Sequence, residues 1–314
     1  AEADFVQAQA ELQRRLLDRQ LRNPLETCLM AEDGVTVYSL TQATEALLER
    51  DQPIAALLRP HAARLLKEMV HVPLHSVAQL LLTAGQASRP EGFDHAVQAM
   101  ALAGALMLQQ DGSTAEVRVA MLAGLLHDLG EMYIDPRYGE ADADRNLDFL
   151  SYQQLVVHPH VGHLLIAQLT NYPGSVSRAI AEHHERLDGS GYPHGLRRDA
   201  VSPLGRLLAV AEGTLGALRG ERPHLSRASV ALRVVPSEFD LGWVGLVEQA
   251  ARAQPARRSA HGADEVRLRL GLLDRPQTDE DPEPRGDGAG SGVSGRGFSD
   301  LSAHGLCAAL DQSA

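Results

Sequence analysis

Apolar residues recur three or four positions apart along most of the chain up to about residue 254, which is the spacing of amphipathic helices. In the first part of the chain this pattern is short and interrupted, and prolines stand at or near several helix starts. Residues 35–38 alternate instead, and we interpret them as a strand or as the exit of a turn. We expect a small, mostly helical module over residues 1–85, with helices at 4–22, 41–50, 53–58, 60–69 and 73–83. No motif in this module indicates its role.

A stronger helical signal begins after residue 90. Residues 91–109 are rich in apolar side chains, and Ser113 with Glu116 forms a capping-box pattern for the next helix. That helix, 117–126, is apolar almost all round except Arg118, so we expect it to be buried. The remaining patterns predict an all-α fold, with further helices at 151–170, 175–185, 203–219, 225–234 and 241–254.

The composition changes after about residue 255. Residues 275–298 combine an acidic, proline-containing stretch with Gly- and Ser-rich sequence, and they carry few apolar side chains. Such a segment cannot bury enough surface to offset the entropy that it would lose on ordering. We therefore predict that 255–314 is a polar, largely disordered tail with at most a short helix near 301–310.

Charge and cysteine content narrow the classes of partner. The 41 acidic and 29 basic residues give a formal net charge of −12, which argues against a nucleic-acid polymer or an anionic membrane surface. A small anionic substrate stays compatible with this charge, because bound metal ions reverse the local field. The two cysteines, Cys28 and Cys307, lie far apart and fit a reducing compartment without a thiolate metal site. Since we recognise no membrane span and no signal peptide, we expect a cytoplasmic protein.

Five of the 14 histidines stand apart because they fall on predicted helices or at helix ends. They are His95, His127, His158, His183 and His184. Asp128 follows the buried helix together with His127, and a charged pair in that place needs a compensating partner such as a metal ion. Glu91 lies four residues before His95, so both side chains can project from one face of a helix. Each signal is weak alone, since such pairs are more often helix caps or solvated faces.

The longest motif runs from His183 to Pro193 and reads His-His-Glu-Arg-Leu-Asp-Gly-Ser-Gly-Tyr-Pro. Successive side chains on a helix diverge by about 100°, so the two adjacent histidines can bind different metal ions. The glycines and the proline then force a turn. Taken alone, the run fits a helix end with a surface loop as well as it fits a metal site.

The donor types indicate which metals the candidate residues would bind. Imidazole and carboxylate groups suit Fe, Mn or Zn, and the absence of cysteine ligands disfavours a closed structural zinc site. Asp128 can bridge two ions. Two ions about 3.5–4 Å apart would bind a phosphate and hold a hydroxide for attack on phosphorus.

The order of these motifs resembles the HD-GYP domains, a bacterial branch of the HD metal-dependent phosphohydrolase superfamily. The matching motifs are His95, His127-Asp128-Leu-Gly130, His158-Pro159-x-x-Gly162, His183-His184-Glu185-x-x-Asp188-Gly-Ser-Gly-Tyr192-Pro193 and Pro203-Leu-x-Arg206-Leu-Leu-Ala-Val-Ala211. The resemblance covers about residues 88–254. We therefore predict an HD-GYP domain over 88–254, between the N-terminal module and the tail.

The resemblance implies an all-helical fold around two or three divalent metal ions, with Fe or Mn favoured. It implies hydrolysis of the second messenger cyclic di-GMP to pGpG or GMP, and contacts of the signature loop with a diguanylate cyclase (GGDEF) domain. A homodimer is a further expected assembly. The implied metal ligands are Glu91, His95, His127, Asp128, His158, His183, His184 and Glu212, with Asp128 as the bridge and Asp128 and His127 as the catalytic pair. The implied substrate or partner residues are Asp188, Gly189, Gly191, Tyr192, Pro193 and Arg222.

Two positions depart from the family pattern. Family members usually carry a phosphate-contacting Lys four residues after the His of His-Asp, where this chain has Glu131. The last ligand is normally Asp in Val-Ala-Asp, and this chain has Glu212, which can still coordinate through a different rotamer. The leading hypothesis is an active cyclic di-GMP phosphodiesterase. The alternatives are a weak or inactive receptor or scaffold, which Glu131 and Glu212 favour, and a hydrolase of another cyclic dinucleotide such as cyclic GMP-AMP.

Overall fold

The structure is a computed structural model that describes residues 34–133, 152–153, 155–219 and 223–253. Within these ranges the secondary structure is helical and contains no strand, which confirms the predicted all-α fold. The predicted helix at 4–22 and the predicted tail at 255–314 lie outside the described residues. None of the described helices is long and apolar enough to cross a membrane.

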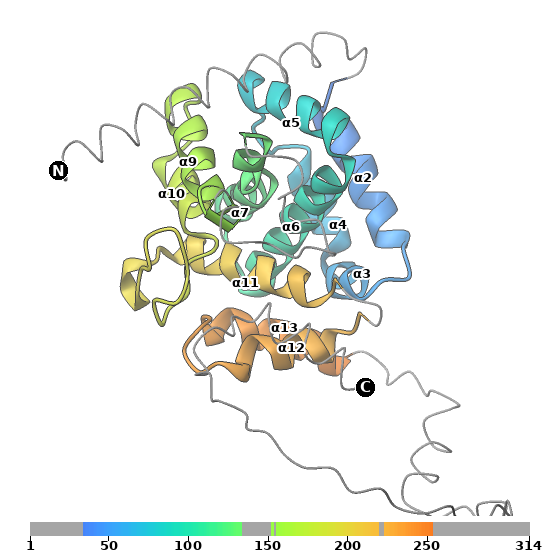
Figure 1. Cartoon of the computed structure of the whole chain (residues 1–314). Coiled ribbons are helices and arrows are strands. Elements are labelled where there is room, and N and C mark those ends of the chain that lie inside the picture. Colours follow the sequence, from blue (N-terminus) through green and yellow to red (C-terminus); the bar gives the residue numbers. More distant parts are fainter. Residues whose placement is uncertain (1–33, 134–151, 154, 220–222, 254–314) are drawn as a thin grey trace, which may run out of the picture. The chain divides into compact units, whose positions relative to one another are not determined.

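Two antiparallel helices, α6 (Pro90–Gln109) and α7 (Thr114–Leu126), pack most extensively against each other (Figure 1). Ser113 and Glu116 form the predicted capping box at the start of α7. The two backbones touch where they cross, because a Cβ on Gly124 would lie 2.7 Å from the carbonyl oxygen of Ala99. This crossing lies about one helical turn from His95 on α6 and about one turn from the end of α7. The close packing therefore holds His95 near His127, which follows α7.

Helix α7 is buried, as its apolar sequence predicts. Arg118 is the exception in that sequence, and its guanidinium pairs with the buried carboxylate of Glu68 at 2.9 Å. The pair satisfies both charges in a place where an isolated one would be costly. Leucines of α6 and α7 fill the core between the helices, and burying each one contributes roughly 1.5–3 kcal/mol.

The described N-terminal helices pack on α6 and α7 and share their hydrophobic core. They are α2 (Val37–Glu49), α3 (Pro53–Leu58), the 3-10 turn η1 (Arg59–His61), α4 (Ala62–Met69) and α5 (Ser76–Ser88). The interpretation of 35–38 as a strand is wrong, because residues 35 and 36 form no strand and α2 already begins at Val37. Thr36 and Ser39 cap this helix through reciprocal bonds of 2.8 and 3.1 Å, which fixes its start. Helix α5 runs through residue 85, and the predicted boundary between a module at 1–85 and a domain at 88–254 stays a prediction.

The second half of the described chain adds α9 (His158–Leu169), α10 (Gly174–Glu182), α11 (Pro203–Ala217), α12 (Leu225–Val234) and α13 (Leu241–Ala253). Helix α10 packs between α9 and α11, and α11 in turn contacts α6 and α12 (Figure 1). A 3-10 turn, η2 (Leu129–Tyr133), follows α7 and lies against α9. These contacts bring the ends of α7 and α10, the start of α9, the second turn of α6 and the middle of α11 to one place.

Gly130 in η2 allows the closest of these approaches. A Cβ at this position would overlap the carbonyl oxygen of His158 and lie 2.8 Å from the backbone nitrogen of Gly162. The two glycines of the His-Asp-Leu-Gly and His-Pro-x-x-Gly motifs thus meet where η2 crosses the first turn of α9. This contact fixes the distance between Asp128 and His158.

We expect Gly130→Ala to destabilise the protein by about 3 kcal/mol, because the added methyl pushes η2 away from α9. The same shift separates ligand groups, so metal content should fall as well. Urea unfolding and elemental analysis measure the two effects. Gly245→Ala in α13 is the matched control, since a Cβ there meets no atom within 4 Å. It should leave the metal content unchanged and raise the stability slightly, by up to about 1 kcal/mol, because Ala favours a helix interior over Gly. Wild-type stability and metal content in Gly130→Ala would contradict this role.

Candidate metal centre

Two groups of side chains at this place can each hold a metal ion. The first consists of His95 from α6, His127 at the end of α7 and Glu212 from α11. His95 Nε2 lies 2.8 Å and His127 Nε2 lies 3.4 Å from Glu212 Oε2. All three residues are buried, and they come from three helices that the core packs together.

The second group consists of Asp128, His158, His183 and His184. His158 begins α9, whereas His183 and His184 follow the last residue of α10. The adjacent histidines therefore both face inward, and their ring centroids lie 4.1 Å apart. The structure brings together seven of the eight predicted metal ligands in these two groups.

Asp128 lies between the two groups and presents a different oxygen to each. Its Oδ2 lies 3.1 Å from His127 Nε2 and 3.4 Å from His95 Nε2. Its Oδ1 lies 3.4 Å from His158 Nε2 and 3.3 Å from His183 Nε2. This is the placement that a carboxylate bridging two ions requires.

Backbone carbonyls fix the orientation of three of the imidazoles. The Nδ1 atoms of His127, His158 and His183 lie 2.8, 2.7 and 2.6 Å from the carbonyl oxygens of Gly124, Leu155 and Ile180. Each Nδ1 therefore carries the proton and donates it, which leaves a lone pair on Nε2. Metal-bound histidines are held in this way in proteins, because the bond sets both the tautomer and the ring direction.

The ring nitrogens and carboxylates fit divalent ions. His158 Nε2 and His183 Nε2 lie 3.1 Å apart, and with both protons on Nδ1 neither can donate to the other. Among the described residues, His127 Nε2, Asp128 Oδ1 and Glu212 Oε2 are buried atoms that make no hydrogen bond. Buried polar atoms without hydrogen bonds are rare. A cation in the first group would satisfy His127 Nε2 and Glu212 Oε2, and a cation in the second group would satisfy Asp128 Oδ1.

Electrostatics hold the two carboxylates in the ionised form that binds metals. Burial alone would raise the pKa of Asp128, but a protonated His127 beside it holds this pKa well below its usual range. Burial would lower the pKa of His127, and Asp128 raises it well above its usual range. A metal ion between these groups would supply the positive charge in place of the proton on His127. Burial would likewise raise the pKa of Glu212, whereas His95 and Arg219 hold it well below the usual range. Burial lowers the pKa of His183, which favours the neutral imidazole that a metal requires.

The signature loop after α10 is built around His184 and Glu185. Tyr192 stacks on the His184 ring, with centroids 4.6 Å apart and planes 21° apart, and its backbone N–H donates to the His184 carbonyl at 3.1 Å. Gly191 allows this return of the chain, because a Cβ there would overlap the backbone of Arg186. The buried Glu185 carboxylate accepts 2.7 Å bonds from two backbone N–H groups further along the loop. The loop thus positions a candidate ligand.

Other predicted loop residues shape the turn. Asp188 Oδ1 accepts hydrogen bonds from the backbone and hydroxyl of Ser190 at 2.9 and 2.7 Å. Gly189 has a φ of +87°, a conformation that suits glycine, and Pro193 follows a cis peptide bond. Arg222 lies outside the described residues.

The structure does not bring Glu91 into either group. Glu91 is exposed in the first turn of α6, whereas His95 one turn later is buried. Both line a cavity of about 560 Å³, together with Arg219. A third ion bound by Glu91 therefore stays a prediction.

Two arginines that lie at the site are not among the residues predicted from the sequence. Arg219 donates to Glu212 Oε1 at 3.0 Å and lies 3.2 Å from His95 Nδ1, so it turns the other oxygen of Glu212 toward the histidines. Arg219 follows the end of α11, but its spacing of seven from Glu212 would place both on one face of the helix predicted at 203–219, so the sequence contained a signal for this pair. Arg89 pairs with Glu131 at 3.1 Å across 42 positions, and no local pattern indicates such a pair.

The sequence profile of the HD domain matches residues 77–238, which include all seven grouped residues. The chain belongs to the HD domain family. This match confirms the membership predicted from the histidine and glycine motifs. The HD domain begins within α5 and therefore includes part of the segment that the sequence assigned to the N-terminal module.

Curated relatives of this HD domain include phosphodiesterases. The chain is 33% identical over 166 residues to a cyclic di-GMP phosphodiesterase of Pseudomonas aeruginosa, covering 52% of this chain and 39% of that protein. It is 25% identical over 218 residues to a 3'3'-cGAMP-specific phosphodiesterase of Vibrio cholerae, covering 65% and 46%. A solved structure, of an HDG"Y"P protein from Bdellovibrio bacteriovorus, matches with a TM-score of 0.47 at 18% identity, covering 74% of this chain and 78% of that one. The chain thus spans less than half the length of these two curated relatives.

Proposed function

We propose that this HD domain is a metal-dependent phosphodiesterase that hydrolyses cyclic di-GMP to pGpG or GMP. The observation that carries the proposal is the position of Asp128, with one carboxylate oxygen facing each histidine group. The similarity to a cyclic di-GMP phosphodiesterase supports the choice of substrate. A hydrolase of cyclic GMP-AMP is the second candidate, because the relative with that specificity matches over the longer stretch.

Two divalent ions at this site would neutralise phosphoryl charge and activate water. The protein's own part is to orient the donors. Asp128 would bind both ions, and His127 would bind one of them while its Nδ1–H is held by the Gly124 carbonyl. The buried surroundings strengthen each of these electrostatic contacts relative to water.

We further propose Fe or Mn as the bound metal, because the grouped donors are imidazole nitrogens and carboxylate oxygens with no thiolate among them. Contacts of the signature loop with a diguanylate cyclase domain, a homodimer and a cytoplasmic location remain predictions from the sequence. The loop's stacking on His184 would couple any partner bound there to a metal ligand.

The direct test is hydrolysis by protein purified without oxygen and loaded with Fe or Mn. Cyclic di-GMP and cyclic GMP-AMP are compared at equal concentration, and the products are separated by chromatography. Faster conversion of cyclic di-GMP supports the proposal, and faster conversion of the mixed dinucleotide supports the second candidate. Tight binding of either without conversion, at full metal content, supports a receptor instead.

Arg219 should be needed for metal affinity because it positions Glu212. We expect Arg219→Gln to weaken binding of the more loosely held ion by about 10- to 100-fold, which is typical for the loss of a residue that orients a ligand. Titration against a competing chelator measures the change. Arg252→Gln is the control, since this arginine is 78% exposed and pairs with Glu248 on α13. Unchanged metal affinity in Arg219→Gln would show that Glu212 holds its position unaided.

A further inference from the structure

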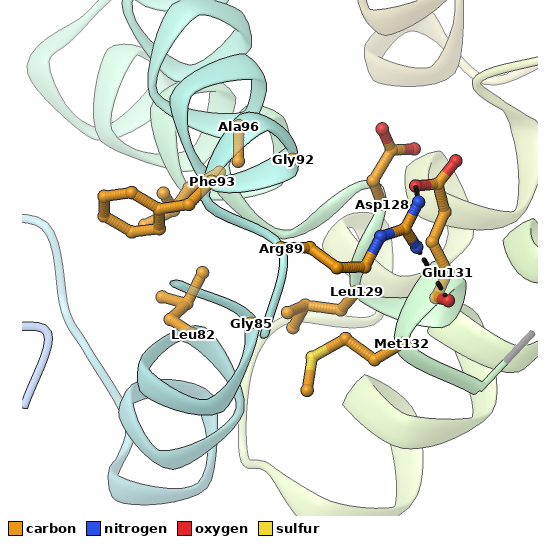
Figure 2. A pocket seen from close by; sticks show the side chains of 11 residues that line it. Leu82, Gly85, Arg89, Gly92, Phe93, Ala96, Asp128, Leu129, Glu131 and Met132 are labelled. Atoms are coloured by element: carbon orange, nitrogen blue, oxygen red, sulfur yellow. Dashed lines mark hydrogen bonds and ion pairs between the residues drawn. The ribbon is translucent and has the colours of Figure 1, made fainter. Parts of the chain in front are cut away.

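A second cavity lies beside the metal centre, because Asp128 is one of its lining residues, and Arg89 is the one positively charged side chain in that lining. Its volume of about 50 Å³ has room for a few water molecules or a phosphoryl oxygen, not for a nucleoside. Leu82, Phe93 and Leu129 contribute to a mostly apolar wall. The charged residues that line it are Arg89, Asp128 and Glu131. Figure 2 shows the Arg89 side chain extending across this cavity toward Glu131, with Asp128 on the same side.

Glu131 holds the Arg89 guanidinium by two contacts. Nη2 of Arg89 lies 3.1 Å from Glu131 Oε2, and Nη1 donates to the Glu131 backbone carbonyl at 3.0 Å (Figure 2). The Arg89 side chain is 16% exposed and that of Glu131 is 5% exposed, so neither samples many rotamers. The backbone of Arg89 is also fixed, because its N–H donates to the Gly85 carbonyl at 2.7 Å at the junction of α5 and α6.

The ion pair between Arg89 and Glu131 leaves N–H groups of the guanidinium that can donate to a ligand. A guanidinium has five N–H groups, and the two contacts with Glu131 use two of them. Its charge is permanent, and it binds phosphate oxygens in a fixed planar geometry. Asp128 connects this cavity to both candidate metal groups, so a phosphoryl group bound at the metals would have an oxygen near the cavity.

We propose that Arg89 binds a phosphoryl oxygen of the substrate from this cavity and that Glu131 fixes its guanidinium there. The inference rests on the proposed phosphodiester substrate. It gives Glu131 the role of a positioning residue, whereas in the sequence Glu131 stands where the family usually has a phosphate-contacting Lys and so favours a weak or inactive receptor. A purely structural ion pair between η2 and the start of α6 is the competing explanation.

The double variant Arg89→Gln/Glu131→Gln separates the two explanations, because it removes the cation and keeps the net charge of the pair at zero. The probe is inorganic phosphate, titrated calorimetrically into the Mn-loaded protein. We expect phosphate binding to weaken at least about tenfold, with metal content unchanged. Arg233→Gln/Glu248→Gln removes another ion pair, with a distance of 2.8 Å between α12 and α13, and should bind phosphate like the wild type.

Phosphate affinity in the Arg89→Gln/Glu131→Gln protein within about twofold of wild type would overturn the proposal, as would a wild type that binds no phosphate. The titration measures binding of inorganic phosphate and does not require the protein to hydrolyse a substrate. A wild-type protein that binds phosphate through Arg89 but leaves cyclic dinucleotides intact would therefore reject the proposed function and retain this inference.

A second measurement needs no variant and covers the case in which the double variant does not fold. Phenylglyoxal modifies accessible arginines, and mass spectrometry of peptides from the wild-type Mn-loaded protein gives the rate at each one. We expect phosphate to slow modification of Arg89 severalfold while the exposed Arg252 reacts at an unchanged rate. Equal rates at Arg89 with and without phosphate would overturn the proposal.

Discussion

Replacing Asp128 by Asn is expected to reduce hydrolysis of cyclic di-GMP by at least about 10³-fold, because metal ions supply several kcal/mol of charge stabilisation to such a reaction. Asp128 Oδ2 faces His95 and His127, and Oδ1 faces His158 and His183. An amide has no charge, and one of its two terminal atoms is a donor that cannot bind a cation. Initial rates and elemental analysis on the same preparation measure the loss of activity and of metal.

Asp199→Asn is the matched control for this change. The Asp199 side chain is fully exposed and pairs with Arg206, and neither residue belongs to the two metal groups, so its replacement should leave both rate and metal content near wild type. An Asp128→Asn protein that keeps its ions and turns over at the wild-type rate would show that the two groups do not share this carboxylate.

Removing the metal ions is expected to abolish hydrolysis and to lower the melting temperature by on the order of 10 °C. Ions bind the folded groups and not the unfolded chain, and about 4 kcal/mol of stabilisation follows when the free ion is a thousandfold above its Kd. For a domain of this size each kcal/mol corresponds to roughly 2–4 °C. Without metal, the buried Nε2 atoms of His158 and His183, which lie 3.1 Å apart, would lose the cation that these residues would hold. Thermal unfolding with and without a chelator measures the shift, and adding Mn back should reverse it.

The Asp128→Asn protein provides the control for chelation. Since it lacks the shared ligand, the chelator should shift its melting temperature much less than that of the wild type. Equal melting temperatures for ion-free and ion-loaded wild type, with the metal content verified, would contradict a structural contribution from the ions.

The sequence predicted most of the side chains that the structure brings together, because each motif has a local spacing that can be recognised by itself. Their role as metal ligands stays a prediction. The helical pattern places His95 on α6, the capping box fixes the start of α7, and its apolar sequence buries the helix that ends at His127. The glycines of the motifs then predict close backbone approaches, although only the structure shows that Gly130 meets the first turn of α9.

The remaining features depend on pairs that are distant in the chain or on side-chain direction. Arg89 and Glu131 are 42 positions apart, so no periodicity connects them. The stacking of Tyr192 on His184 depends on how the loop folds back, which glycine content alone does not specify. Glu91 has the correct helical spacing from His95 yet is exposed, because spacing defines a shared face and not the depth of each side chain.

Metal content and cyclic di-GMP turnover, measured on one sample purified without oxygen, test the proposed function most directly. The two groups that share Asp128 predict at least two Fe or Mn ions per chain and conversion of cyclic di-GMP to pGpG or GMP. A protein that holds those ions and leaves cyclic di-GMP intact would contradict the assignment as a cyclic di-GMP phosphodiesterase.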